Sequence, residues 1–347
     1  MGMIKLPKNS IDFFSQNYPE IFESGNLAEG AWGKKVSEWS CKYTSSKYSL
    51  AVNSNGAGLF ALLRILKEYR HKNKVFLQSN TMYGVKTIAL SSGLNLCGYV
   101  ECSLDSLMPK YEQVKNFISN LDKPDECVFL LTHIGGWVNP DIIKISKLCK
   151  AKGISLIEDC AHTFGSTLKG NHTGTFGDAG VYSFYATKAI PVGEGGIVVT
   201  KDKELYEMME KFIMYDRFDQ KLDIGVNLRM SEINALMTYS VIQETEAIIQ
   251  NKYKVAKIYI DACKKYNWSF IDPKSNSQRS NLYKFILLSY SDNPTEEFSQ
   301  ITTRTSPVYD YALGDDTNQL SMRHICLPVW YGLENKLVNN VLSELVR

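Results

Sequence analysis

The stretch Asp178–Thr200, DAGVYSFYATKAIPVGEGGIVVT, places one lysine where the chain has little room for a charge. Val181 to Tyr185 is apolar, aromatic and β-branched, as a buried strand requires, and Ile197 to Thr200 has the same character. Three glycines at positions 193, 195 and 196 predict a turn before the second strand. Lys188 therefore lies in a tight bend between two core strands.

A lysine in such a bend has two explanations. Burying its charged form is costly, and buried lysines with a depressed pKa serve as amines for Schiff bases. A lysine at a strand end can instead lay its apolar stem along the fold and keep its amine in water. Taken alone, Lys188 favours the second explanation, because lysine is seldom buried.

Residues 153–166, GISLIEDCAHTFGS, shift that balance. Ile154 to Ile157 predicts a strand body, and Glu158-Asp159 stand at its carboxyl end, where open α/β sheets bind ligands. Asp159 alone is equally an N-cap for the turn that follows. Beside the amine of a neighbouring bend, it is the second group that pyridoxal phosphate needs: the amine holds the aldehyde, and the carboxylate keeps the pyridine nitrogen protonated.

Length and charge narrow the class of protein. A chain of 347 residues allows a large domain and a smaller one, on a prior of about 150 residues each, and we place the boundary near residue 240, giving 1–240 and 241–347. Lys and Arg number 39 against 37 Asp and Glu, without a basic tract, so neither nucleic acid nor a membrane surface is an expected partner.

The amino terminus lacks the apolar core of a signal peptide, and no run of about 18 apolar residues occurs. The eight cysteines form no C-x-x-C pair, which is typical of buried thiols in a reducing cytoplasm. We therefore expect a cytoplasmic protein. His324 has no second ligand-type residue at metal spacing, so we interpret it as structural and expect no metal site.

Short apolar strands alternate with helical segments over the first half of the chain. The predicted strands are 74–78, 94–100, 127–132 and 154–158, and the helical segments between them lie near 83–92, 110–120 and 140–151. This alternation predicts an α/β fold with a mostly parallel sheet covered on both faces. Beyond Thr200, helical segments reaching about Lys265, a strand at 282–290 and a closing helix from about Glu334 predict a smaller α+β domain.

The segment after residue 47 suggests an anion site. YSLAVNSN, 48–55, predicts a strand that turns at Gly56-Ala57-Gly58 into a helix with apolar residues at helical spacing. Free N–H groups and the helix dipole at such a turn favour phosphate. Most turns of this kind merely cap a helix, so the signal is weak by itself.

Taken together, these segments resemble the DegT/DnrJ/EryC1/StrS family of pyridoxal phosphate enzymes, the sugar aminotransferases. The likeness runs nearly end to end, through SGNLAEG, VNSNGAGLFAL, IEDCAHTFGS, GDAGVYSFYATKAIPVGEGGIVVT, GVNLRMSEINA and CLPVWYGLENKLVNNV. It implies a fold-type I, aspartate aminotransferase-like large domain with a mostly parallel sheet and a smaller α+β carboxyl-terminal domain.

The resemblance implies a role for each matching position. Lys188 would form the Schiff base with the coenzyme and then move the proton as a base. Asp159 would pair with the pyridinium nitrogen. Gly56 and Ala57 would offer backbone N–H groups to the phosphate, and Ser183 would add its hydroxyl.

Three further positions follow from the resemblance. Met82 stands where the family usually stacks an aromatic ring on the coenzyme, and its sulfur can pack there instead. His162 replaces the glutamine that often contacts the ring's 3-oxygen, which keeps a hydrogen-bonding group. Asn227 would reach the phosphate of the neighbouring subunit, which implies a homodimer with shared active sites. Ala189 replaces the asparagine that commonly follows the lysine, and Ala57 lacks the family's threonine hydroxyl.

The activity implied is transfer of an amino group from glutamate to a nucleotide-linked keto-deoxysugar, with pyridoxamine phosphate as intermediate and 2-oxoglutarate as product. The amino sugar would serve a surface polysaccharide or glycoconjugate. A dehydratase branch of the family also uses the coenzyme, but it carries histidine at the lysine position. A non-catalytic regulatory relative is the other alternative, and such a protein has no reason to keep a costly buried amine.

Overall fold

The computed structural model describes residues 4–215, 222–274 and 277–346. At its centre lies a seven-stranded sheet of order β1-β9-β8-β5-β4-β2-β3, in which β9 alone runs against the other strands. The strands are β1 (Tyr48–Val52), β2 (Lys74–Gln78), β3 (Asn95–Val100), β4 (Cys127–Thr132), β5 (Ser155–Cys160), β8 (Ala179–Ser183) and β9 (Gly196–Thr200).

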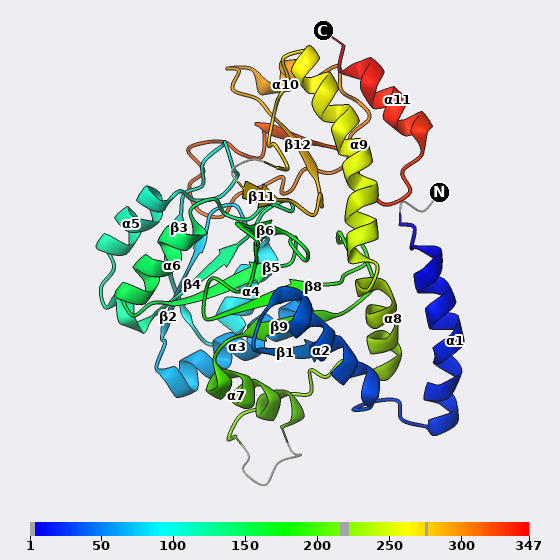
Figure 1. The fold of residues 1–347 in the computed structure, drawn as a ribbon. Helices are drawn as coiled ribbons and strands as arrows, with labels where there is room; N and C mark the ends of the chain where they lie inside the picture. The colour runs from blue at the N-terminus through cyan, green and yellow to red at the C-terminus, as the bar shows by residue number, and fades with distance from the viewer. Residues whose placement is uncertain (1–3, 216–221, 275–276, 347) are drawn as a thin grey trace.

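Both faces of this sheet are buried, as Figure 1 shows from the helices on either side. Successive side chains of β4 alternate between two cores: Val128 and Leu130 pack in one, and Phe129 and Leu131 in the other. The first core lies under α3 (Asn55–Arg70), α4 (Tyr83–Ser91) and α7 (Lys203–Met214), and the second under α5 (Tyr111–Ser119) and α6 (Ile142–Ala151). The predicted α/β class with a mostly parallel sheet is confirmed.

The amino-terminal helices and α8 form a further apolar cluster. It contains side chains of α1 (Lys8–Ser24), α2 (Ala31–Thr44) and α8 (Glu232–Ile242), packed against β8 and β9. The sequence did not predict α1, because its buried side is narrow: Ser10 and Ile21 are the buried residues of a helix that also contains Pro19. Among the described residues, no helix combines the length and the apolar character needed to cross a bilayer.

The carboxyl-terminal part forms a small α+β layer. The three-stranded sheet of order β10-β12-β13 shares its core with α9 and α11. A third small sheet, of order β11-β6-β7, joins this part to the loop after β5. The elements are β6 (Thr167–Leu168), β7 (Asn171–His172), α9 (Thr245–Lys265), β10 (Ser269–Phe270), β11 (Gln278–Arg279), β12 (Phe285–Leu288), α10 (Pro294–Glu297), β13 (His324–Leu327) and α11 (Asn335–Glu344).

The long helix α9 belongs to two cores. Ile248 packs with the amino-terminal helices, whereas Ala256 and Tyr259 pack under the small sheet. The predicted helical tract up to about Lys265 is therefore two helices, α8 and α9, and the boundary near residue 240 stays a prediction.

The expected strand 48–55 and its turn need a correction. Strand β1 ends at Val52, and α3 already begins at Asn55, so Gly56, Ala57 and Gly58 lie in the first helical turn. The cause is Ser54, whose extended backbone and side chain make it an N-cap: its Oγ accepts a hydrogen bond from the Ala57 N–H at 3.1 Å.

Candidate active site

Asp159 lies near the carboxyl end of β5 and is 2% exposed. Its Oδ1 accepts hydrogen bonds from Asn55 Nδ2 and from the Ala161 N–H, both at 3.1 Å, and its Oδ2 accepts one from Thr132 Oγ1 at 3.3 Å. Burial raises the pKa of this carboxyl, while these donors and the charge of Lys188 oppose the rise. Three neutral donors thus hold this carboxylate, and none of them brings a positive charge to it.

Lys188 follows β8 in a tight bend. The bend is closed by the Lys188 N–H, which donates to Tyr185 O at 2.9 Å, and by the Ala186 N–H, which donates to Gly193 O at 2.9 Å. Burial lowers the pKa of the Lys188 amine to about 8, and the charge of Asp159 partly opposes that. The amine and the carboxylate therefore act on each other inside one site, as a coenzyme held between them requires.

The amino terminus of α3 lies beside β8 and β9. Ser183 pairs with Gly196 across the two strands, and a Cβ on Gly196 would come within 2.6 Å of the Ser54 carbonyl carbon. Ser183 is therefore next to the first turn of α3, where Gly56 and Ala57 lie. Because only a glycine lets the two backbones approach so closely, this cradle of N–H groups and a hydroxyl is built by the fold.

His162 belongs to the same region. Its ring stacks on Tyr283, with centroids 4.4 Å apart, and its Nδ1 accepts a hydrogen bond from the Gly135 N–H at 3.3 Å. Burial holds the pKa of His162 well below its usual value, and the charge of Lys188 adds to this. The imidazole is therefore neutral, with Nε2 as its hydrogen donor.

Met82 and Asn227 are two predicted site residues that are exposed. Met82 is the N-cap of α4 and is 44% exposed, and a hydrogen bond joins its backbone to Tyr309. Asn227 is exposed, and its Oδ1 accepts a hydrogen bond from the Arg229 N–H. Within the described part of this one chain, Asn227 forms no hydrogen bond with Asp159 or Lys188.

Several contributors to the site were missed from the sequence. Asn55 and Thr132 hold Asp159, and the rule that ligands gather at the carboxyl ends of strands would have found Thr132, the last residue of β4. Tyr283 lies 5.2 Å from the Lys188 amine, measured to the ring centroid, and Tyr309 is close enough to Asp159 for the carboxylate to raise its pKa. Both tyrosines come from the carboxyl-terminal part, where no local pattern marks them.

Glu158, the neighbour of Asp159, belongs to the fold. Its two oxygens accept hydrogen bonds from the N–H groups of Gly174, Phe176 and Gly177 at 2.7–2.8 Å, and His133 Nε2 lies 2.8 Å away. His133, Glu158 and Cys160 have ligand atoms within 4.8 Å of one another. His133 Nδ1 already accepts a hydrogen bond from the Asn139 N–H, and the carboxylate oxygens of Glu158 already accept hydrogen bonds from N–H groups. We therefore interpret this cluster as structural: it holds the loop that follows β7.

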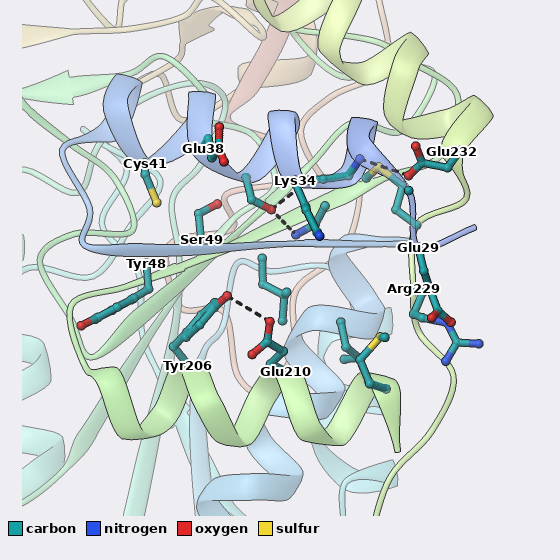
Figure 2. A pocket seen from close by; sticks show the side chains of 18 of the residues that line it. Glu29, Lys34, Glu38, Cys41, Tyr48, Ser49, Tyr206, Glu210, Arg229 and Glu232 are labelled. Carbon is teal, nitrogen blue, oxygen red and sulfur yellow. Dashed lines mark hydrogen bonds and ion pairs between the residues drawn. The ribbon is translucent and has the colours of Figure 1, made fainter. Parts of the chain in front are cut away.

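Two cavities adjoin these elements. One of about 50 Å³ is lined by Lys188, Lys252, Thr187 and Tyr283, among others. The larger, of about 460 Å³, lies along β1 between α2 and α7, as Figure 2 shows. Among the described residues that line it, none is a residue predicted to bind the coenzyme.

Known proteins share this architecture over the full chain. PseC of Helicobacter pylori, an aminotransferase involved in the biosynthesis of pseudoaminic acid, matches with a TM-score of 0.84 and 21% identity, covering 98% of this chain and 96% of that one. The PLP form of the putative sugar aminotransferase Spr1654 from Streptococcus pneumoniae also gives a TM-score of 0.84, at 17% identity, with 98% and 96% covered. At these identities the likeness establishes the fold.

Sequence relatives with named activities are also found. GDP-perosamine synthase of Vibrio cholerae is 29% identical over 370 residues, covering 98% of both chains. The enzyme of the same name in Escherichia coli O157:H7 is 34% identical over 165 residues, 46% of this chain and 44% of its own length. The Helicobacter pylori UDP-4-amino-4,6-dideoxy-N-acetyl-beta-L-altrosamine transaminase is 26% identical over 69% of this chain and 64% of its own length.

The family comparison covers nearly every residue. The model of the DegT/DnrJ/EryC1/StrS aminotransferase family matches residues 9–346, a span that includes the buried acid, the lysine bend and the small carboxyl-terminal sheet. On this match and the shared fold, the chain belongs to the DegT/DnrJ/EryC1/StrS aminotransferase family.

Proposed function

We propose that the protein transfers the amino group of glutamate to a nucleotide-linked keto-deoxysugar in amino sugar biosynthesis. The observation that carries the proposal is the buried pair of Asp159 and Lys188, whose charges act on each other at the carboxyl ends of β5 and β8. Relatives that make perosamine and altrosamine derivatives support a nucleotide sugar as the acceptor.

The residues present fit pyridoxal 5′-phosphate, the coenzyme of this family. A buried carboxylate held by neutral donors suits a protonated ring nitrogen, so Asp159 would hold that end. The first turn of α3 and Ser183 would hold the phosphate, with Gly56 giving its N–H group and Ala57 sharing its N–H between Ser54 Oγ and the phosphate. Bound there, the coenzyme supplies an electron sink for the carbon that loses its proton.

Two further residues would complete the contacts with the ring. Met82 would pack on its face through the thioether, and His162 would donate from Nε2 to the 3-oxygen. Since the imidazole is buried and neutral, it would donate without adding a positive charge beside Lys188.

Lys188 would bind the aldehyde and then move the proton. With its pKa near 8, about a tenth of the amine is neutral at pH 7, against about one in three thousand for an ordinary lysine. A base that is neutral and positioned contributes on the order of 10²–10⁴ to the rate. Burial of Lys188 therefore supplies the amine that both donor and acceptor steps need.

We infer a homodimer with shared active sites. Asn227 is exposed and forms no hydrogen bond with Asp159 or Lys188 among the described residues of its own chain, which suits a side chain that reaches the phosphate of a partner subunit. We also place the protein in the cytoplasm, because all eight cysteines are free thiols and most are buried, as in a reducing compartment.

The proposal is tested by adding glutamate to the yellow holoprotein and following its absorbance, then supplying a panel of nucleotide-linked 3-keto and 4-keto sugars. Lys188→Ala should abolish turnover and still bind pyridoxamine phosphate, while the exposed control Lys201→Ala should behave as wild type. Turnover by Lys188→Ala would refute the assignment. A colourless protein that is unaffected by added coenzyme would favour the regulatory alternative, and loss of a sugar hydroxyl without amination would favour the dehydratase.

A further inference from the structure

A second buried lysine, Lys252, has no part in the reaction proposed above. It lies in α9, is 3% exposed, and burial alone lowers its pKa to about 7. Its amine donates to two backbone carbonyls, Ala189 O at 3.3 Å and Asn281 O at 3.4 Å. No ion pair joins it to a carboxylate among the described residues. Lysine is rarely buried without an acidic partner. Because its only polar contacts described are these two carbonyls, the role of Lys252 must be sought in the segments to which the carbonyls belong.

The first carbonyl belongs to the residue that follows Lys188. Hydrogen bonds from the Lys188 and Ala186 amides close the bend from within. The Ala189 carbonyl takes no part in these hydrogen bonds and instead accepts one from Lys252 in α9. The Ala189 side chain carries no polar atom. Among the described residues, the hydrogen bond from Lys252 to the Ala189 carbonyl is therefore the polar contact between the bend and α9.

The second carbonyl belongs to Asn281, which holds the segments that carry His162 and Tyr283. Asn281 Nδ2 donates to His162 O at 2.9 Å and to Phe164 O at 3.0 Å, and Asn281 Oδ1 accepts from the Tyr283 N–H at 2.9 Å. Tyr283 in turn stacks on His162 and lies beside the Lys188 amine. Lys252 therefore joins the bend to the segment that orients His162 and Tyr283.

A long side chain with several N–H donors suits this position. The two carbonyls come from segments far apart in the sequence and converge on one buried point. An apolar side chain there would leave both without a donor, and a buried carbonyl without a partner is unfavourable. Lys252 and Lys188 also line the same small cavity, so the two lysines are close neighbours.

We propose that Lys252 is a positioning residue, which clamps the bend carrying Lys188 against the Asn281–Tyr283 segment and so holds the Lys188 amine towards Asp159. In this role it acts through the Ala189 carbonyl and contributes no group to the reaction itself. The inference rests on the proposed role of Lys188 as the amine that binds the coenzyme.

The test compares Lys252→Met, which keeps the length of the stem and removes the donors, with Lys257→Met on the exposed side of α9. Hydrogen exchange is measured by mass spectrometry on the coenzyme-free proteins. In Lys252→Met the amides of residues 186–193 should exchange about tenfold faster than in wild type, and α3 and β5 should be unchanged. Lys257→Met should match wild type throughout. Exchange in 186–193 at the wild-type rate would overturn the inference.

Kinetics of the holoprotein give a second readout. For Lys252→Met, kcat should fall about tenfold or more while KM for the amino donor stays within about twofold, because a displaced base slows the chemistry and leaves binding intact. The pH midpoint of the visible absorbance should also move, since it reports the surroundings of the Lys188 nitrogen. A kcat within twofold of wild type would overturn the inference whatever the exchange data show.

If Lys252→Met does not fold, Lys252→Gln decides, because its amide reaches one carbonyl at most. Faster exchange in 186–193 of that variant supports the clamp, and the wild-type rate overturns it. The exchange measurement needs no coenzyme or substrate. An inactive wild type would therefore count against the proposed function and leave the test of Lys252 intact.

Discussion

Two adjacent carboxylates in β5 have unlike surroundings. Glu158 and Asp159 point to opposite faces of the sheet, because successive side chains of a strand alternate. Glu158 meets three N–H groups and His133, and so fixes a loop. Asp159 meets an amide, a hydroxyl and one backbone N–H, and keeps the charge of Lys188 in reach. The first is a structural acid and the second is available for chemistry.

Glu158→Gln should lower the free energy of unfolding by about 3 kcal/mol, because either orientation of the amide turns its NH₂ towards buried donors. Urea unfolding of the coenzyme-free protein measures it. The control is Glu112→Gln on the surface of α5, where little change is expected. Equal stability of Glu158→Gln and wild type would show that the loop does not depend on this acid.

The proposed role of Lys188 predicts that coenzyme capture depends on pH. The folded pKa lies near 8, below the ordinary value of 10.5, and only the neutral amine attacks an aldehyde. The capture rate of the coenzyme-free protein should therefore rise with pH, reach half its maximum near pH 8 and level off by about pH 9. Stopped-flow absorbance between pH 6 and pH 10 measures this, and a rate still rising tenfold per unit above pH 9 would place the amine in water.

At the scale of elements, the site depends on how closely β9 approaches α3. Ser54 starts the helix, and Gly196 allows the strand to pass within contact distance of its first turn. Gly58 has a related role, since a Cβ there would lie 2.7 Å from Val181 Cγ1 in the sheet below. The turn that we propose for the phosphate is thus positioned by packing as well as by its own hydrogen bonds.

Gly196→Ala should weaken coenzyme binding about tenfold, since the added methyl group meets the Ser54 and Asn55 backbone at 2.6–2.7 Å and must displace the start of α3. Titration of the coenzyme-free protein with pyridoxal phosphate gives the Kd. Gly33→Ala in α2, where the nearest atom to the new Cβ is 3.6 Å away, is the control that should bind normally. Unchanged affinity of Gly196→Ala would mean that the turn tolerates displacement.

The sequence predicted those elements whose signal is local. The strands 74–78 and 127–132 match β2 and β4 residue for residue, because apolar runs bounded by turn residues define them. The start of α3 was wrong by several residues, since the pattern of glycines obscured the cap at Ser54. Asp159 and Lys188 were proposed from motifs, and in the structure their charges influence each other. Tyr283 and Tyr309 lie near them through long-range folding that no local pattern encodes.

At the scale of the whole molecule, the site joins parts with separate cores. Asp159 and Lys188 belong to the large sheet, and Tyr283 and Tyr309 come from the segments around the small sheet. Helix α9 extends along one side of the molecule from one part to the other (Figure 1), and it contains the buried Lys252. A shift of the small sheet would therefore reach Lys188 through contacts already in place.

Shared sites in a homodimer can be tested by complementation. Chains with Lys188→Ala and chains with Asn227→Ala should each be inactive or nearly so alone. Refolded together in equal amounts, they should recover about a quarter of wild-type activity, because half the dimers are mixed and each mixed dimer has one intact site. No recovery, despite mixed dimers confirmed by mass spectrometry, would show that each chain completes its own site.

The amide of Asn55 links two features that are usually considered separately. From the first turn of α3 it donates to Asp159 Oδ1 and, at 2.9 Å, to the carbonyl of Val181 in β8. One side chain thereby fixes the distance between the turn proposed for the phosphate and the acid proposed for the ring nitrogen. The Asn55 amide would therefore determine how long a coenzyme the site accepts. Shortening or lengthening the side chain at position 55 would change which coenzyme analogues bind.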